Sequence, residues 1–318
     1  MVVAVTGANG FLGSYIVKAF LETGHKVIAL VRKSADFSTL EIHQKVQIEV
    51  VDYSNKLDLQ FIALKEKYGD LTYFIHNAGV TVSLKKEEYF QVNVELTKSI
   101  LKGIKSSGWL PPQAKWIQVS SMAATGPYAS GQPVSQYGES KLAAEKAIIK
   151  SSFPHLILRP TGIYGAGDVA FLPLFKLAAK GIYPLTRRTQ KMSMIHASDL
   201  SRTIVKEARN NSGVLHVSDG NTYSHQDFIK SLEAATKKKI RRIPTSGWLS
   251  RASLGLSDIW HRTLNKRPGL TLEKFQEISD DWHLHENPEL RFSLERSKVS
   301  LTEGFQDAFN YYQKNNLL

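Results

Sequence analysis

Three closely spaced glycines near the N-terminus constrain the fold of this chain more than any other feature. An apolar run at 2–6 leads into Gly7-Ala8-Asn9-Gly10-Phe11-Leu12-Gly13, and helical spacing follows over 11–22. Where a strand turns into a helix, the first glycine permits a tight turn, the second lets a pyrophosphate approach the backbone, and the third allows close helix packing. The free N–H groups at the helix start favour an anion. We therefore predict a dinucleotide site at Gly7, Asn9, Gly10, Phe11, Leu12 and Gly13; the alternative is a turn that only reverses the chain.

The rest of the first half alternates short apolar runs with longer amphipathic stretches. This alternation is typical of a parallel sheet covered by helices on both faces. We expect strands at 2–6, 26–31, 46–51, 71–76, 115–120 and 156–159, and helices at 11–22, 57–67, 87–106 and 136–151. After residue 160 proline and glycine become frequent, and short strands are expected at 191–196 and 214–217. The prediction is an α/β, Rossmann-type doubly wound parallel sheet in 1–160, with a return segment near 191–217 and a smaller α/β substrate lobe mainly in 161–318.

The end of the second expected strand indicates which dinucleotide is bound. NAD-binding chains carry a carboxylate there, about 20 residues past the glycines, that accepts hydrogen bonds from the adenosine ribose. This chain has Val31-Arg32-Lys33-Ser34 instead. Arg32 and Lys33 can pair with a 2′-phosphate through charge-assisted hydrogen bonds. We therefore expect NADP, with NAD as the alternative if both cations are ordinary surface residues.

A tyrosine and a lysine at helical spacing are the candidate catalytic pair. Tyr137 and Lys141 lie four residues apart in an alanine-rich helical stretch, which places them on one helix face. An adjacent ammonium lowers the pKa of a phenol from its usual value of about 10 and fits it for proton transfer at neutral pH. Upstream, Ser120 and Ser121 end the strand expected at 115–120. Ser121 is our candidate for orienting a substrate oxygen; Ser120 is the competitor, and capping of the next turn is the structural alternative for either.

These motifs together resemble the extended short-chain dehydrogenase/reductases, a family of epimerases, dehydratases and 3β-hydroxysteroid-dehydrogenase-like reductases. The resemblance continues in His76-Asn77-Ala78-Gly79, in Asn93-Val94 and in Arg159-Pro160-Thr161-Gly162-Ile163-Tyr164-Gly165. It implies that Lys141 also holds the nicotinamide ribose and that long helices pair into a homodimer. It further implies cofactor contacts at Asp52, Tyr53, His76, Ala78, Gly79, Asn93, Pro160, Gly162 and Ile163.

Departures from the family pattern bear on the reaction. Sugar-nucleotide members usually continue the serine segment into Val-Tyr-Gly, whereas this chain has Met122-Ala123-Ala124-Thr125-Gly126. Its Leu30-Val31-Arg32 is more similar to flavonoid- and steroid-type reductases that use NADPH. We therefore expect an NADP(H)-dependent oxidoreductase that interconverts a carbonyl and a secondary alcohol. The alternatives are a sugar-nucleotide epimerase or dehydratase and a non-catalytic NADP-binding protein; the complete Ser/Tyr/Lys set argues against the latter.

Composition narrows the classes further. The chain has 318 residues and no cysteine, which excludes disulfides and thiolate chemistry. No stretch reaches the roughly 18 apolar residues of a membrane span, and the glycine motif follows Met1 too closely to leave room for a secretory leader. We expect a cytoplasmic protein with a small-molecule substrate and no integral membrane segment.

The net charge of +12 suits an anionic ligand, but no nucleic-acid-binding signature is present, so no nucleic-acid partner is expected. The densest basic run, 237–242, is predicted to be a solvated helix end and loop. An apolar stripe from Trp248 to Trp260 is interpreted as helix packing; the alternative is the roof of an apolar pocket or a peripheral membrane contact. We expect no metal, because the histidines are not clustered with carboxylates at metal-ligand spacing: His196, His216, His225, His283 and His285. His196 is interpreted as a structural hydrogen-bonding residue.

Overall fold

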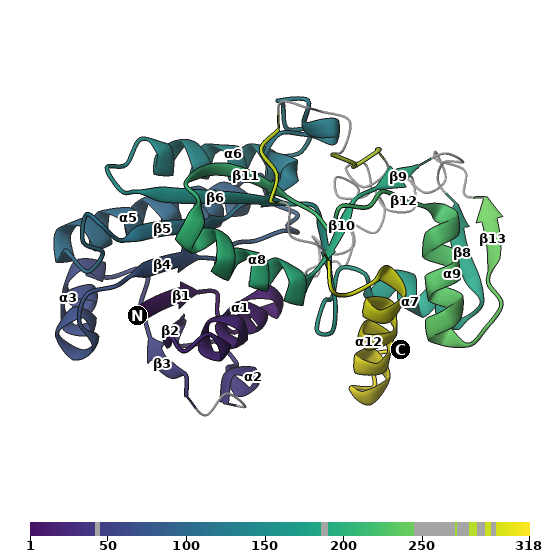
Figure 1. Cartoon of the computed structure of the whole chain (residues 1–318), viewed down its shortest axis with the longest axis horizontal. Coiled ribbons are helices and arrows are strands. Elements are labelled where there is room, and N and C mark those ends of the chain that lie inside the picture. The colour runs from purple at the N-terminus through teal and green to yellow at the C-terminus, as the bar shows by residue number, and fades with distance from the viewer. Residues whose placement is uncertain (42–44, 186–189, 245–270, 272–279, 285–289, 294–296) are drawn as a thin grey trace.

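A seven-stranded parallel sheet forms the centre of the protein, in the order β11-β6-β5-β4-β1-β2-β3 (Figure 1). The computed structural model describes residues 1–41, 45–185, 190–244, 271, 280–284, 290–293 and 297–318. The strands are β1 Val2–Thr6, β2 Lys26–Val31, β3 Gln47–Val50, β4 Tyr73–His76, β5 Lys115–Val119, β6 His155–Pro160 and β11 Gly213–Val217. The order reverses between β1 and β4, and ligands of doubly wound sheets bind outside the carboxyl ends of the strands at such a point. The predicted fold class is confirmed.

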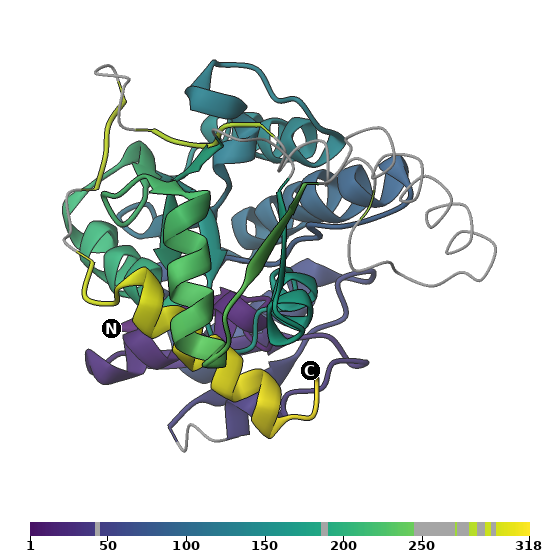
Figure 2. The same ribbon diagram turned by 90° about the vertical axis from the view of Figure 1, so that its right-hand side faces the viewer.

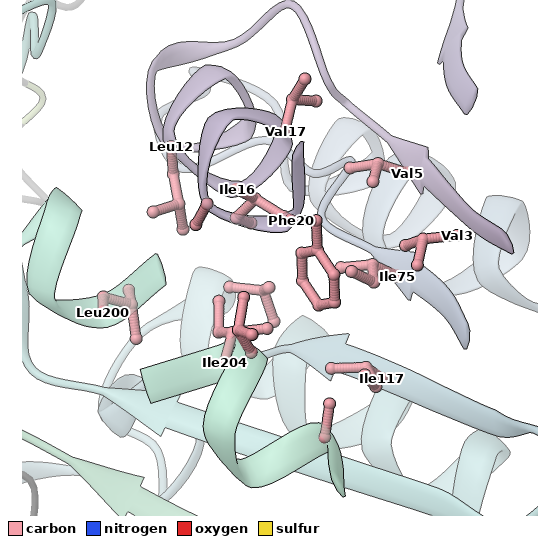
Figure 3. Packing of buried hydrophobic residues seen from close by; sticks show 14 of the residues in the cluster. Val3, Val5, Leu12, Ile16, Val17, Phe20, Ile75, Ile117, Leu200 and Ile204 are labelled. Carbon is pink, nitrogen blue, oxygen red and sulfur yellow. The ribbon is translucent and has the colours of Figure 1, made fainter. Parts of the chain in front are cut away.

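One face of the sheet is covered by α1 (Phe11–Glu22) and α8 (Ala197–Asn210), which also contact each other. Side chains alternate between the two faces along each strand, so every second residue of the sheet turns toward these helices. In Figure 3, Ile16 and Phe20 of α1 gather with Ile204 of α8 over the strands that carry Ile75 and Ile117. All five side chains are completely buried, so the two helices are held on the sheet by apolar packing.

The opposite face is covered by α3 (Leu57–Tyr68), α5 (Leu96–Ser107) and α6 (Gln136–Ile149), around a second apolar cluster. The helix predicted at 87–106 is not uniform. It consists of α4 (Lys86–Phe90), a π-helical turn at Gln91–Glu95, and α5. A π turn gives one residue a different direction from the one α-helical spacing would provide, and it is often found at functional sites. Apolar periodicity does not reveal such a turn.

A smaller lobe follows β6 and has its own apolar core. Its helices are α7 (Leu172–Ala179), α9 (His225–Thr236) and α12 (Leu301–Lys314), and α12 runs beside α9 (Figure 2). Its strands form two-stranded pairs: β7 (Gly162–Tyr164) with β10 (Met194–His196), β9 (Lys191–Met192) with β12 (Tyr223–Ser224), and β8 (Ile182–Leu185) with β13 (Arg241–Pro244). A short helix α2 (Ser38–Glu41) follows β2 in the larger part.

The basic run at 237–242 departs from its prediction. Lys237, Lys238 and Lys239 are exposed after the end of α9, as expected of a solvated helix end. The loop predicted for the remainder is wrong, because Arg241 and Arg242 lie in β13 and pair in parallel with β8. All four side chains of β13 are exposed, so its sequence carries no apolar alternation that would indicate a strand. The stripe between Trp248 and Trp260 lies outside the described residues. Within the described part of the chain, no helix combines the length and the apolar character needed to cross a membrane.

Candidate functional site

The glycine turn is packed directly against the end of β4. Gly7 has a φ of 63°, and a Cβ on it would lie 2.8 Å from Ala78 Cα. A Cβ on Gly13 would lie 2.0 Å from the Gly7 carbonyl oxygen, so no larger residue fits there. The Gly10 N-cap of α1 has no side-chain cap, and the first turn carries no acidic residue. The first N–H groups of α1 are therefore not taken by a side-chain cap, which fits the binding of a pyrophosphate.

The end of β2 presents two exposed cations beside this turn. Among the described residues, neither Arg32 nor Lys33 has an ion pair or a side-chain hydrogen bond. Asn9 Nδ2 donates to the Asp36 carbonyl over 3.0 Å, which ties the glycine turn to the loop after β2. The Asp36 carboxylate accepts from the Ser38 backbone N–H, a contact that lowers its pKa. The cations at this edge are therefore available for an anionic group.

Asp52 and Tyr53 follow β3, the outermost strand on this side. The Asp52 carboxylate accepts from the Ser54 backbone and hydroxyl, which lowers its pKa, and the charge of Lys33 acts in the same direction. The Tyr53 hydroxyl donates to the Leu30 carbonyl over 3.4 Å, and burial raises the pKa of this phenol. Both residues therefore lie near the end of β2, on the same sheet edge as the two cations.

A buried chain of hydrogen bonds links the ends of β1 and β4 to the π turn. His76 Nδ1 lies 2.7 Å from Thr6 Oγ1, and its Nε2 lies 2.9 Å from Thr97 Oγ1. Thr97 donates its hydroxyl proton to the Asn93 carbonyl over 2.7 Å, so it accepts from His76, whose Nε2 must carry the proton. Burial, reinforced by the charge of Lys141, lowers the pKa of His76 to about 3. His76 is therefore a neutral structural link at neutral pH.

Asn93 lies in the π turn and brings the predicted residues together. Its Oδ1 accepts from the Val80 N–H over 2.9 Å, and its Nδ2 donates to the Ser140 hydroxyl, also over 2.9 Å. A Cβ on Gly79 would lie 2.9 Å from Asn93 Oδ1 and 3.3 Å from Lys141 Nζ. The segment after β4, the π turn and α6 therefore meet at Lys141.

Tyr137 and Lys141 occupy the first two turns of α6, which begins after the N-cap Ser135. The Lys141 ammonium lies 5.9 Å from the centre of the Tyr137 ring and donates to the Val119 carbonyl over 3.1 Å. The side chains are only 7% and 6% exposed, respectively. Burial lowers the pKa of Lys141 to about 8, and the nearby Glu145 carboxylate opposes this effect. The pair therefore lies at the carboxyl end of β5, where an ammonium can stabilise a phenolate.

The two candidate serines have different partners. The buried Ser120 hydroxyl donates its proton to the Glu145 carboxylate. The Ser121 oxygen accepts from the Ala123 N–H over 3.1 Å and caps the 3₁₀ turn at Met122–Ala124. Accepting this bond leaves the hydroxyl proton of Ser121 for another oxygen. The hydroxyl proton of Ser120 is thus already donated to Glu145, whereas Ser121 has the predicted capping role.

An apolar cluster surrounds the tyrosine. Tyr137 belongs to a buried group that includes Val80, Tyr89, Met122 and, from the C-terminal part of the chain, Trp282 and Leu284. The ring centres of Tyr89 and Tyr137 are 6.2 Å apart. The Tyr137 ring is thus packed among apolar side chains.

Of the cofactor contacts predicted near the end of β6, two lie outside the central sheet. Pro160 ends β6, but Gly162 and Ile163 belong to β7, which pairs with β10 and not with the central sheet. His196 ends β10, and its Nδ1 lies 2.8 Å from the Ser198 hydroxyl, the structural role predicted for it. The described residues contain no group of three histidine or carboxylate side chains arranged to hold a metal ion.

A buried ion pair beneath the lysine was not predicted. Arg159 Nε donates to Glu145 Oε1 over 3.0 Å, and Arg159 Nη2 donates to Glu145 Oε2 over 2.6 Å. Their side chains are 15% and 1% exposed, respectively. The sequence signals only the position of Glu145, which follows Lys141 by the same four residues that separate Lys141 from Tyr137; it does not indicate Arg159 as the partner.

Comparisons with known proteins agree with this fold. The model of the NAD dependent epimerase/dehydratase family matches residues 3–219. A ceramide reductase of Caulobacter vibrioides is 29% identical, over 98% of this chain and 94% of that protein. A UDP-glucose 4-epimerase of Vibrio cholerae is 28% identical, over 82% of this chain and 84% of that protein. The crystal structure of a UDP-glucuronic acid 4-epimerase from Bacillus cereus, in complex with UDP-glucuronic acid and NAD, has the same fold: it superposes with a TM-score of 0.72 at 20% identity, covering 99% of this chain and all of that one.

Proposed function

The chain belongs to the NAD dependent epimerase/dehydratase family, and from this premise we propose that it is an NADP(H)-dependent oxidoreductase that interconverts a carbonyl and a secondary alcohol. The observation that carries the proposal is the buried Tyr137/Lys141 pair at the carboxyl end of β5. A pure binding protein needs no phenol beside a buried ammonium.

In this mechanism the protein binds the cofactor, orients the substrate and transfers a proton. The glycine turn would hold the pyrophosphate, and Lys141 would hold the nicotinamide ribose; when bound, the nicotinamide supplies or accepts the hydride. Ser121 donates to the substrate oxygen and orients it. Tyr137 gives its phenolic proton to that oxygen during reduction and takes a proton from it during oxidation. The ammonium of Lys141 stabilises the resulting phenolate.

Two observations support NADP over NAD. Arg32 and Lys33 are exposed cations without a side-chain partner among the described residues, and an arginine can grip a 2′-phosphate with two parallel hydrogen bonds. The position where NAD-binding chains carry a carboxylate is occupied by Arg32 itself. A ribose 2′-hydroxyl would find no acceptor in this side chain.

We propose an amphiphilic lipid carbonyl as the substrate. The ceramide reductase of Caulobacter vibrioides aligns over nearly the whole length of both chains, including the lobe that follows β6. The apolar side chains packed with Tyr137 suit such a substrate, because burial of apolar groups contributes roughly 25 cal/mol per Å². A ceramide also carries a secondary alcohol, the group that this reaction would form.

Spectroscopy of the nicotinamide tests the proposal. The protein is mixed with NADPH and a ceramide whose secondary alcohol has been oxidised to a ketone, and we expect the NADPH absorbance to fall as the alcohol appears. The likeness to the UDP-glucose 4-epimerase of Vibrio cholerae supports a second candidate, a sugar-nucleotide epimerase. Interconversion of UDP-glucose and UDP-galactose with no net change at the nicotinamide band would reject the first function in favour of the second.

A further inference from the structure

We propose that Glu145 is a positioning residue of the reaction: held by Arg159 and Ser120, its carboxylate supplies the counter-charge that keeps the Lys141 ammonium charged beside Tyr137. The use of the Lys141 charge in catalysis rests on the proposed function. The effect of the Glu145 charge on Lys141 does not rest on that function, and it can be measured without turnover.

Three hydrogen bonds from two residues hold the carboxylate of Glu145. Arg159 reaches it from β6 with two parallel hydrogen bonds, and Ser120 reaches it from the end of β5 with its hydroxyl proton. The side chain is 1% exposed, so it cannot turn toward water without breaking these bonds. An isolated charge at such a depth is costly, whereas a carboxylate with a bidentate guanidinium partner is tolerated. The arrangement therefore keeps an ionised carboxylate at a fixed place one helical turn beyond Lys141.

The other charged and titratable groups around Lys141 cannot take over this role. Tyr137 on α6 is the group that the ammonium serves, and His76 on β4 is neutral at neutral pH. Arg159 on β6 is a cation that would repel Lys141 if its own partner were lost. The contacts from β5 and the π turn are uncharged: the Val119 carbonyl accepts from Lys141, and Asn93 lies beside Gly79. Among these groups, Glu145 is the anion whose charge acts on Lys141, from a position one helical turn further along α6.

A charge balance of this kind makes a prediction that simple packing does not. Replacing Glu145 by glutamine removes the attraction and leaves Arg159 as an unpaired cation, so the pKa of Lys141 should fall furthest. Replacing both residues removes attraction and repulsion together, so the fall should be smaller. Replacing Arg159 alone leaves the carboxylate acting on Lys141, so the pKa should rise. The expected order of Lys141 midpoints is Arg159→Gln, wild type, the double variant, and then Glu145→Gln.

The experiment is an NMR titration of the full chain labelled with ¹³C at the lysine Cε, with Lys141 assigned from the Lys141→Arg spectrum. From a wild-type midpoint near the value of about 8 that burial sets, Glu145→Gln should lower it by about one pH unit or more. Glu139→Gln is the matched control. It removes a carboxylate from the exposed side of the same helix, where Glu139 pairs only loosely with Lys86 at 3.9 Å, and it should leave the Lys141 midpoint unchanged.

Equal midpoints in wild type and Glu145→Gln, with both proteins folded by circular dichroism, would overturn the inference. If Glu145→Gln does not fold, Glu145→Asp decides the matter, because it keeps the charge but draws it back by one methylene; its midpoint should fall by less, and an unchanged midpoint counts against us. The pH–rate profile for alcohol oxidation gives the second readout, since a less charged Lys141 should move the Tyr137 limb to higher pH. The ordered midpoints without any turnover would leave this inference standing and reject the proposed function. Turnover with unmoved midpoints would do the reverse.

Discussion

The ammonium nitrogen of Lys141 lies 5.9 Å from the centre of the Tyr137 ring, and both side chains are almost completely buried on one face of α6. Van der Waals packing alone does not account for a buried ammonium beside a phenol, because taking the charge out of water is costly. The arrangement is explained if the ammonium stabilises negative charge that forms on the phenol oxygen during the reaction.

Removal of the phenol oxygen tests that explanation. Tyr137→Phe should lower kcat by about 10²- to 10⁴-fold, the usual contribution of general acid–base catalysis, while NADPH binding is retained. Tyr89→Phe is the matched control, because it removes a buried hydroxyl that accepts from the Ser83 N–H over 2.8 Å, close to but outside the proposed catalytic pair. Steady-state rates of both variants test whether the Tyr137 hydroxyl takes part in the reaction. Undiminished turnover by Tyr137→Phe would contradict the assignment, and an unchanged role of this variant in the cell would favour the non-catalytic alternative.

Arg32→Ala should weaken NADPH binding by about 10- to 100-fold, which corresponds to the roughly 1.5–3 kcal/mol of a hydrogen bond to a charged group. NADH lacks the 2′-phosphate, so its affinity should change little. Lys102→Ala on the exposed side of α5 is a control for the loss of one positive charge. Fluorescence titration with both cofactors measures the effect, and an equal loss for NADPH and NADH would remove the basis for the cofactor choice.

Two glycines of the turn should separate stability from binding. In Gly13→Ala the new Cβ would lie 2.0 Å from the Gly7 carbonyl oxygen, so the turn must open, and we expect a lower Tm together with weak cofactor binding. In Gly10→Ala the Cβ lies 3.3 Å from the same oxygen, so the fold should persist while the methyl group hinders the pyrophosphate. Thermal melting and NADPH titration of both variants check this. Normal NADPH affinity in Gly10→Ala would place the phosphates elsewhere.

Acid should destabilise the fold through two buried histidines. Burial lowers the pKa of His76 to about 3 and that of His216 to about 4, whereas both titrate near 6.5 in the unfolded chain. Below about pH 6.5 the unfolded state binds more protons, so their contribution is complete above that pH and is lost as the pH falls toward 4 and 3. Each histidine should cost about 2 kcal/mol of unfolding free energy at pH 5. Asp168 acts in the opposite direction, because burial raises its pKa to about 6 and the folded state takes up its proton first.

Urea unfolding at pH 7 and pH 5 measures the loss. In His216→Phe the difference in unfolding free energy between the two pH values should shrink by about 2 kcal/mol, because one of the two histidines that destabilise the fold in acid is gone. Ile157→Val, at a buried position of β6 next to β11, is the control: it removes one methyl group and no titrating group, so it should retain the full wild-type difference. If the His216→Phe difference matched the wild-type value, His216 would not be the group responsible.

The sequence predicted the parts of the site that local patterns determine. The glycine turn, the strand ends and the Tyr137/Lys141 spacing are contiguous motifs, and the family resemblance extends over the same region. The helix α1 has the predicted bounds because apolar residues recur at helical spacing directly after the turn. Local pattern and tertiary structure agree there, since the same apolar face packs on the sheet.

The remaining parts depend on contacts between distant segments. The pairing of Glu145 with Arg159 joins α6 to β6, and the local sequence of neither segment indicates its partner. The π turn that aims Asn93 at Val80 and Ser140 is stabilised by those partners and leaves no mark on the apolar periodicity. The strand β13 is exposed on every side chain, so only its pairing with β8 defines it. Each of these features follows from tertiary structure and not from local propensity.

Transfer of a labelled hydride tests the central claim most directly. The protein is given a limiting amount of NADPH that carries deuterium in the transferable position at nicotinamide C4, together with the ketone form of a ceramide, and the product is analysed by mass spectrometry. We predict that the alcohol carries one deuterium on its carbinol carbon, in an amount equal to the NADPH consumed, and that Tyr137→Phe yields almost none. Deuterium that stays in NADPH, with no labelled alcohol formed, would contradict the account.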